Sequence, residues 1–133
     1  MRKAIIFGIM ISVILMSCSK TNNSPFIGTY NGSGASNTIS RVTIGAAGST
    51  NLQVQLQVQS GGVYYTFATI QNAVPASGTS LSVNENGLIF GSSETYHFVG
   101  TGALSGNNLT LSGSATNVNN SSDVRLYYFT GSK

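Results

Sequence analysis

The stretch NLQVQLQVQ, Asn51 to Gln59, alternates apolar and amide side chains without interruption. Leu52, Val54, Leu56 and Val58 lie on one face of an extended chain, because successive side chains of a strand point to opposite faces. The glutamines lie on the other face. One apolar and one polar face are typical of an antiparallel strand that packs on a core and faces water. The stretch therefore predicts a half-buried β-strand.

The rest of the chain divides into similar short segments separated by turn-forming residues. Glycine, asparagine, serine and proline supply the backbone geometry of turns, and they cluster in AAGS, VPASG, NENG, SGN and NVNNSS. No segment shows sustained helical periodicity. Including 51–59, we expect eight strands, at 26–32, 38–45, 51–59, 62–70, 80–84, 95–102, 107–113 and 123–131.

Eight short strands joined by short loops predict an all-β fold with sequential antiparallel neighbours. Closing such a meander into an eight-stranded up-and-down barrel removes its exposed edges. A two-sheet β-sandwich is the alternative. The segment 62–70 is ambiguous, since apolar residues occupy both of its faces, and it carries a bulge or is covered on both sides. The expected inward residues are Val42, Ile44, Leu52, Val54, Leu56, Val58, Leu81, Val83, Leu109, Leu111, Val124, Leu126 and Tyr128.

The N-terminus has the pattern of a lipoprotein signal. Arg2 and Lys3 precede an apolar run from Ala4 to Met16, which is shorter than the ~20 apolar residues that span a bilayer. The run ends in LMSC, which resembles the lipobox of bacterial lipoproteins through Leu15, Ser17 and Cys18. The resemblance implies that Leu15 and Ser17 are read by the signal peptidase. It also implies that Cys18 carries the lipid.

This resemblance implies a division of the chain and a location for it. Residues 1–17 would be the signal peptide, 18–25 a lipidated tether, and 26–133 one β domain. More than one acyl chain on Cys18 gives stable anchoring to a membrane without spanning it. Ser19 follows the cysteine in place of the aspartate that retains lipoproteins at the inner membrane, so we expect an outer-membrane lipoprotein on the periplasmic face. An ordinary secretory signal or an uncleaved anchor is the alternative.

The charge of the mature chain argues against a nucleic-acid partner. From Cys18 onward there are four Lys or Arg and three Asp or Glu, a formal charge of four minus three, or +1. No basic cluster is available to neutralise phosphates. Cys18 is also the only cysteine, so no disulfide and no thiolate metal site is expected.

The segment FIGTY, residues 26–30, resembles the Gly-x-Trp opening of lipocalins and other calycin barrels, with Tyr30 at the tryptophan position. Together with the lipobox and the eight strands, it makes the chain similar to the lipocalin-like lipoproteins common in Bacteroidota. In that family the aromatic closes the barrel floor and a late arginine packs across it. The resemblance implies this role for Arg125, with Arg41 as second choice.

The inventory of reactive side chains does not favour an enzyme. His97 is the only histidine, and Glu94 lies an odd number of residues away, on the opposite face of a strand. Glu85 is expected in an exposed NENG turn, and Asp123 at the start of the last strand. No nucleophile elbow, P-loop or dinucleotide motif is present. We therefore expect no catalytic residues, no metal and no cofactor.

The remaining aromatic residues suggest binding. We expect a non-catalytic module that binds a small apolar molecule or an envelope protein, through an internal pocket or an outer surface that stacks on a sugar. The alternative is a structural or scaffolding lipoprotein with a filled core. The candidate ligand-lining residues are Tyr30, Tyr65, Phe67, Tyr96, Phe98 and Tyr128.

Overall fold

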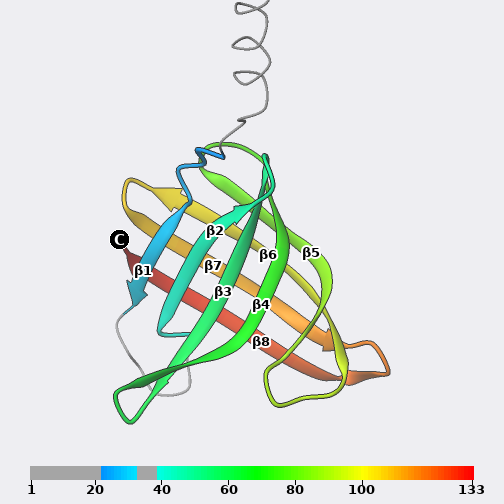
Figure 1. Ribbon diagram of the computed structural model, residues 1–133. Coiled ribbons are helices and arrows are strands. Elements are labelled where there is room, and N and C mark those ends of the chain that lie inside the picture. Colours follow the sequence, from blue (N-terminus) through cyan, green and yellow to red (C-terminus); the bar gives the residue numbers. More distant parts are fainter. Residues whose placement is uncertain (1–21, 33–38) are drawn as a thin grey trace, which may run out of the picture.

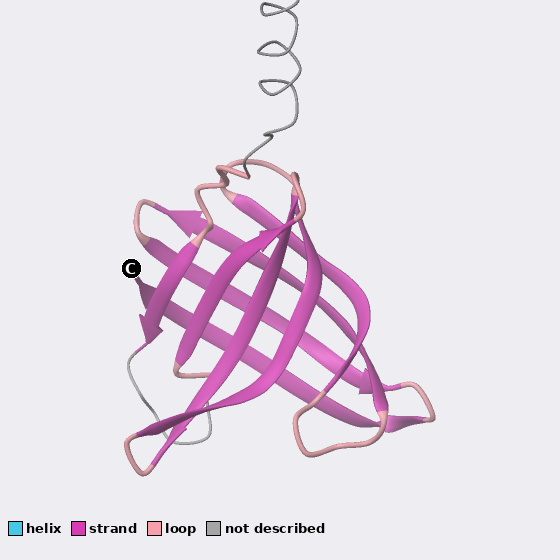
Figure 2. Cartoon of the chain, viewed as in Figure 1, coloured by secondary structure: helices cyan, strands magenta, loops and turns pink. Residues whose placement is uncertain are grey.

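The computed structural model describes residues 22–32 and 39–133, and within them the chain is all-β, with eight strands and no helix (Figures 1 and 2). No helix in these two ranges is long and apolar enough to cross a membrane. The strands are β1 (Gly28–Gly32), β2 (Arg41–Ala47), β3 (Asn51–Ser60), β4 (Val63–Pro75), β5 (Ser80–Leu88), β6 (Thr95–Ser105), β7 (Asn108–Asn117) and β8 (Asn120–Ser132).

The eight strands form one sheet that closes on itself. Each strand pairs in antiparallel fashion with the next, and β8 returns to β1. The closing contact is short, because it consists of the pairs Asn31↔Ser132 and Gly32↔Gly131. The prediction of eight sequential antiparallel strands is confirmed. The strands belong to one closed sheet, which differs from the two-sheet alternative.

Strand β3 follows its sequence pattern, as expected for a strand with one wet face. Leu52, Val54 and Leu56 are fully buried. Val58 is only partly buried, because it lies near the end of the β3–β4 hairpin, which projects beyond the sheet (Figure 1). Gln57 lies on the opposite face from these residues but is also buried, and it accepts a hydrogen bond from Arg41 Nε at 2.7 Å, which ties β3 to β2.

Strand β4 contains bulges that explain its ambiguous sequence. Leu56 pairs with Ala68, but the next residue, Gln57, pairs with Thr66, so Phe67 is the extra residue. A second register shift lies between the pairs of Leu52 and Val54. Each extra residue reverses which side chains face inward. The bulge proposed from the two apolar faces of 62–70 is therefore present.

Two segments that we expected to be turns lie partly or wholly within strands. The segment NENG lies within β5, where Asn84 pairs with Val99 and Asn86 with His97 on β6. Gly87 lies close to the Phe98 ring, which a Cβ at position 87 would approach to 3.3 Å. Glu85 is consequently a half-buried strand residue, which corrects its placement in an exposed turn. Similarly, β4 continues to Pro75, into the expected VPASG turn.

The inward face of β8 is the opposite of the one expected. Val124, Leu126 and Tyr128 are exposed, whereas Tyr127 and Phe129 are buried. We expected the face that carries the aliphatic residues Val124 and Leu126 to point inward. Tyr127 and Phe129 on the other face bury more apolar area than those residues would.

Two glycines make the space for Tyr127. A Cβ at Gly100 or Gly113 would overlap the Tyr127 hydroxyl. That hydroxyl donates to the Val99 carbonyl at 3.2 Å, and burial raises the pKa of Tyr127 to about 12.

The interior is filled by side chains from all eight strands. The largest fully buried ones are aromatic: Tyr30, Phe26, Phe98 and Phe129. Phe26 precedes β1, and its carbonyl accepts a 2.8 Å hydrogen bond from the buried Tyr30 hydroxyl. Aliphatic residues of β2, β3, β5 and β7 complete one continuous core.

A pair of leucine variants tests the inward face of β7 and β8. Leu111→Ala removes a fully buried side chain, and we expect it to lower the free energy of unfolding by about 2–5 kcal/mol. Leu126 is 82% exposed, so Leu126→Ala should change that free energy by less than about 0.5 kcal/mol. Urea unfolding followed by tyrosine fluorescence measures both. Equal costs would contradict the described face of β8.

Candidate functional site

The sheet is interrupted between β4 and β5. These strands pair at Val74↔Ser82 and Pro75↔Leu81, and meet again only at the bridge Ala68↔Ile89. The pairing of β4 with β5 is offset by one residue between the two sides of this interruption, as expected next to the second β4 bulge. Within the interruption the Asn72 amide donates to Glu85 Oε1 at 3.1 Å, so a carboxylate takes the place of a backbone carbonyl.

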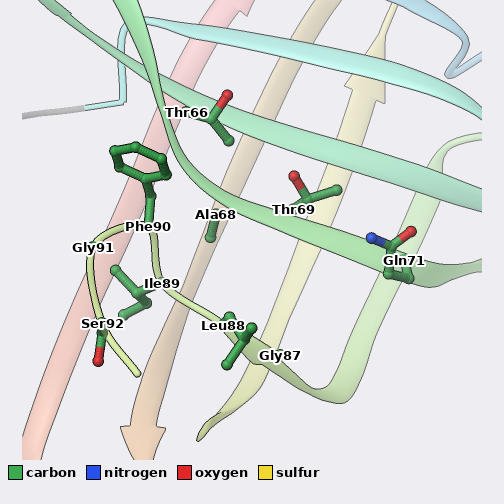
Figure 3. Close-up of a pocket in the computed structure, with 10 residues that line it drawn as sticks. All are labelled: Thr66, Ala68, Thr69, Gln71, Gly87, Leu88, Ile89, Phe90, Gly91 and Ser92. Atoms are coloured by element: carbon green, nitrogen blue, oxygen red, sulfur yellow. The ribbon is translucent and has the colours of Figure 1, made fainter. Parts of the chain in front are cut away.

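A groove of about 500 Å³ opens where the two strands meet again (Figure 3). One wall comes from β4, and the other from the end of β5 and the segment that follows it, as Figure 3 shows. The lining residues are Thr66, Ala68, Thr69, Gln71, Gly87, Leu88, Ile89, Phe90, Gly91 and Ser92.

The lining of the groove is apolar with a polar margin. Ala68 and Ile89 are buried, whereas Leu88 is 59% exposed and Phe90 is 76% exposed. The Phe90 amide is held by the Phe67 carbonyl at 2.8 Å, which fixes the backbone that carries the exposed ring. Apolar surface with a few hydroxyl and amide groups is typical of sites for small apolar molecules or apolar side chains of a partner.

A cluster of polar side chains lies beside the groove, at the ends of β6, β7 and β8. Asp123 accepts hydrogen bonds from the Tyr96 hydroxyl at 2.8 Å, from Arg125 Nε at 3.0 Å and from Asn117 Nδ2 at 3.3 Å. Asn117 also donates to Glu94. The Glu94 amide in turn donates to Ser92 Oγ at 3.2 Å, which connects the cluster to the groove margin.

The electrostatics of this cluster keep Asp123 ionised. Hydrogen bonds from Tyr96, Arg125 and Asn117 lower the pKa of Asp123. The hydrogen bond to Asp123, followed by burial, raises the pKa of Tyr96. A general acid or base works best with a pKa near the ambient pH, and both shifts move away from neutrality. The hydrogen bonds of the cluster join β6, β7 and β8.

The candidate ligand-lining residues do not converge on one cavity. Tyr30, Tyr96 and Phe98 are buried in the core, and Phe67 is partly buried against it. Tyr65 and Tyr128 are about half exposed, on the β3–β4 hairpin and on β8. None of the six lines the groove.

Sequence reasoning missed the residues that do line the groove. The apolar run Leu88, Ile89 and Phe90 follows NENG, and it belongs to no expected strand because NENG has the composition of a turn. Three consecutive apolar residues between two polar segments were the available signal.

A cation does lie over Tyr30, but it is neither of the two expected arginines. Lys133 Nζ is 5.2 Å from the centre of the Tyr30 ring, and it donates to the carbonyls of Pro25 at 2.7 Å and Ile27 at 2.9 Å. Arg125 instead pairs with Asp123, and Arg41 lies 3.8 Å above the Tyr64 ring. Neither Arg125 nor Arg41 therefore packs across Tyr30.

The remaining sequence-derived candidates are dispersed. His97 Nδ1 lies 2.8 Å from Asn86 Oδ1 on the outer face, and Glu94 lies in the polar cluster. In the described part of the chain, no three His, Cys, Asp or Glu residues are grouped as metal ligands would be. Leu15, Ser17 and Cys18 lie outside the described residues.

No family model, no curated protein and no solved structure matches this chain. Any function is therefore argued from its own residues.

The Asp123 cluster predicts a pH-dependent contribution to stability. Because the folded pKa of Asp123 is lowered, its contribution is present above the unfolded pKa of about 4 and is lost as the pH falls through the folded value. Asp123→Asn should therefore be less stable than the wild type at pH 6, and the difference should shrink below about pH 4. Urea unfolding across this pH range measures it.

Tyr96→Phe is the matched control, because it removes the hydroxyl that contributes most to the lowered pKa of Asp123. Tyr96→Phe should show part of the pH-dependent loss of stability that we expect for Asp123→Asn. Parallel stability curves for wild type and Asp123→Asn would contradict the assignment.

Proposed function

We propose that this chain is a lipid-anchored protein of the bacterial cell envelope, whose β domain is a non-catalytic binding module. The β4–β5 groove is its binding site. The ligand is a small apolar molecule or an apolar side chain of an envelope protein. The observation that carries the proposal is the exposed Phe90 ring, held on a fixed backbone beside the buried Ala68 and Ile89.

The position of the groove suits a tethered protein. Asn22, the first described residue, donates to the carbonyl of Asn51 at 2.8 Å and so fastens the chain beside the β2–β3 turn. The segment 88–92 lies at the other end of the closed sheet (Figure 1). An anchor at Cys18 would therefore direct the groove away from the membrane, on the periplasmic face of the outer membrane.

The finer fold class that we propose is a calycin-like up-and-down barrel. The sequential strand order, the buried Tyr30 near the start and the cation over its ring support it. In this barrel a ligand would not bind inside, as it does in a lipocalin, because large side chains fill the interior. Binding on the outside of the barrel, at the interruption in the sheet, follows from that filling.

A second candidate function is a structural lipoprotein without a ligand, favoured by the same filled interior. The two candidates differ at Phe90. In a structural lipoprotein nothing binds against the exposed Phe90 ring, whereas in a binding module a ligand contacts it.

Photo-crosslinking in the host cell tests the groove. The full chain carries a benzophenone analogue of phenylalanine at position 90, and we expect an adduct of one defined mass after irradiation. The same analogue at Tyr65, an exposed aromatic outside the groove, is the control and should give no such adduct. The absence of a defined adduct at position 90, or equal adducts at both positions, would favour the structural function.

A separate experiment tests the anchor. Cells expressing the wild type should incorporate radioactive palmitate into the protein, whereas Cys18→Ala should incorporate none. Ser19→Ala is the matched control and should keep the label. Label retained by Cys18→Ala, or a mature N-terminus at another residue, would exclude lipidation at Cys18.

A further inference from the structure

The outer face of β5, β6, β7 and β8 forms a regular array of outward-pointing side chains, most of them exposed. Every second residue points outward, in Ser80–Asn86, His97–Ala103, Thr110–Thr116 and Val124–Thr130. The register aligns these residues in rows across the four strands. The two central rows are Asn84, Val99, Ser114, Leu126 and Ser82, Thr101, Ser112, Tyr128. We call this surface the β5–β8 outer face.

The β5–β8 outer face carries no Asp, Glu, Lys or Arg at any of these positions. The charged residues next to these positions in sequence are Glu85, Asp123 and Arg125. Glu85 accepts the Asn72 amide at 3.1 Å, and Asp123 and Arg125 bond to each other at 3.0 Å near the start of β8. An anionic partner, such as a nucleic acid or an acidic lipid headgroup, is bound mainly by Lys and Arg, and neither is present on this face.

The chemistry of the face is hydroxyl and amide groups around a few exposed apolar side chains. Tyr128 is 58% exposed, Leu126 is 82% exposed and Val99 is 47% exposed. Ser114 separates Val99 from Leu126, so these two larger side chains stand two strand spacings, or about 10 Å, apart. Small hydroxyl side chains of β7 therefore lie between larger side chains of β6 and β8.

We propose that the β5–β8 outer face binds a neutral polysaccharide chain laid across the strands. A sugar ring presents C–H groups on its faces and hydroxyls around its edge. The Tyr128 ring can receive the C–H face, because the face of an aromatic ring is electron-rich. Serine, threonine and asparagine supply short, adaptable hydrogen-bonding groups for the hydroxyls, and tyrosine supplies rigid contact area. An uncharged, hydroxyl-rich ligand matches an uncharged, hydroxyl-rich surface.

This inference is independent of the groove. No residue of the β5–β8 outer face lines the groove, which is bounded by β4 and the segment 87–92. The loss of one binding activity leaves the other unaffected.

Affinity electrophoresis tests the proposal. The full chain, purified from membranes in a neutral detergent, migrates through native gels that contain a neutral glucan, xylan, mannan or galactan. We expect retardation by at least one of them and none by an anionic polysaccharide such as polygalacturonate. Tyr128→Ala should weaken the retardation at least tenfold, and Tyr128→Phe should largely retain it.

Two further variants keep the test specific. Tyr65→Ala is the matched control, because Tyr65 is 49% exposed and lies away from this face. It should bind as the wild type does. Thr101→Lys places a charge in a central row without altering the core, and it should also weaken binding.

Three outcomes would overturn the proposal. The first is no retardation in any of the four neutral polysaccharides. The second is an equal loss of retardation in Tyr65→Ala and Tyr128→Ala. The third is a native mass of two chains that Leu126→Ser converts to one, because the face would then be covered by a second copy.

Discussion

Closure of the sheet depends on the close approach of β1 and β8, which glycine permits. Gly32 pairs with Gly131, and a Cβ on either residue would collide with the Phe129 ring and with neighbouring backbone. With side chains at these positions the two strands could not meet, and the sheet would have two exposed edges. Lys133, directly after β8, then ties the end of the chain to the carbonyls of Pro25 and Ile27.

This use of Lys133 illustrates how the protein uses its few charges. Each charged residue that the structure describes makes a contact within the fold. Arg41 binds Gln57, Glu85 receives the Asn72 amide, and Glu94 receives Asn117. Asp123 and Arg125 form an ion pair beside Tyr96. The charges thus join strands to one another, and broad areas of the surface are left to hydroxyl and amide groups.

The sequence predicted the features of the fold that depend on local pattern. The inward face of β3 can be predicted from its own sequence, because apolar residues occupy one face of the strand and glutamines occupy the other. In β8 the run from Val124 to Phe129 is apolar on both faces apart from Arg125. The inward face is then chosen by glycines on other strands, Gly100 and Gly113, which make room for Tyr127. A pattern within one strand cannot contain that information.

The place where the groove opens could not be predicted from the sequence, for a related reason. It arises because a bulge in β4 shifts its register against β5, so that pairing fails along part of the two strands. Neither strand alone indicates where a partner will be lost. The other bulge of β4, at Phe67, allows apolar residues on both sides of the strand. The small domain thus combines a filled interior with an exposed apolar groove. Because large aromatic side chains occupy the interior, the binding that we propose takes place on the outer surface, at the interruption in the sheet and on the β5–β8 outer face.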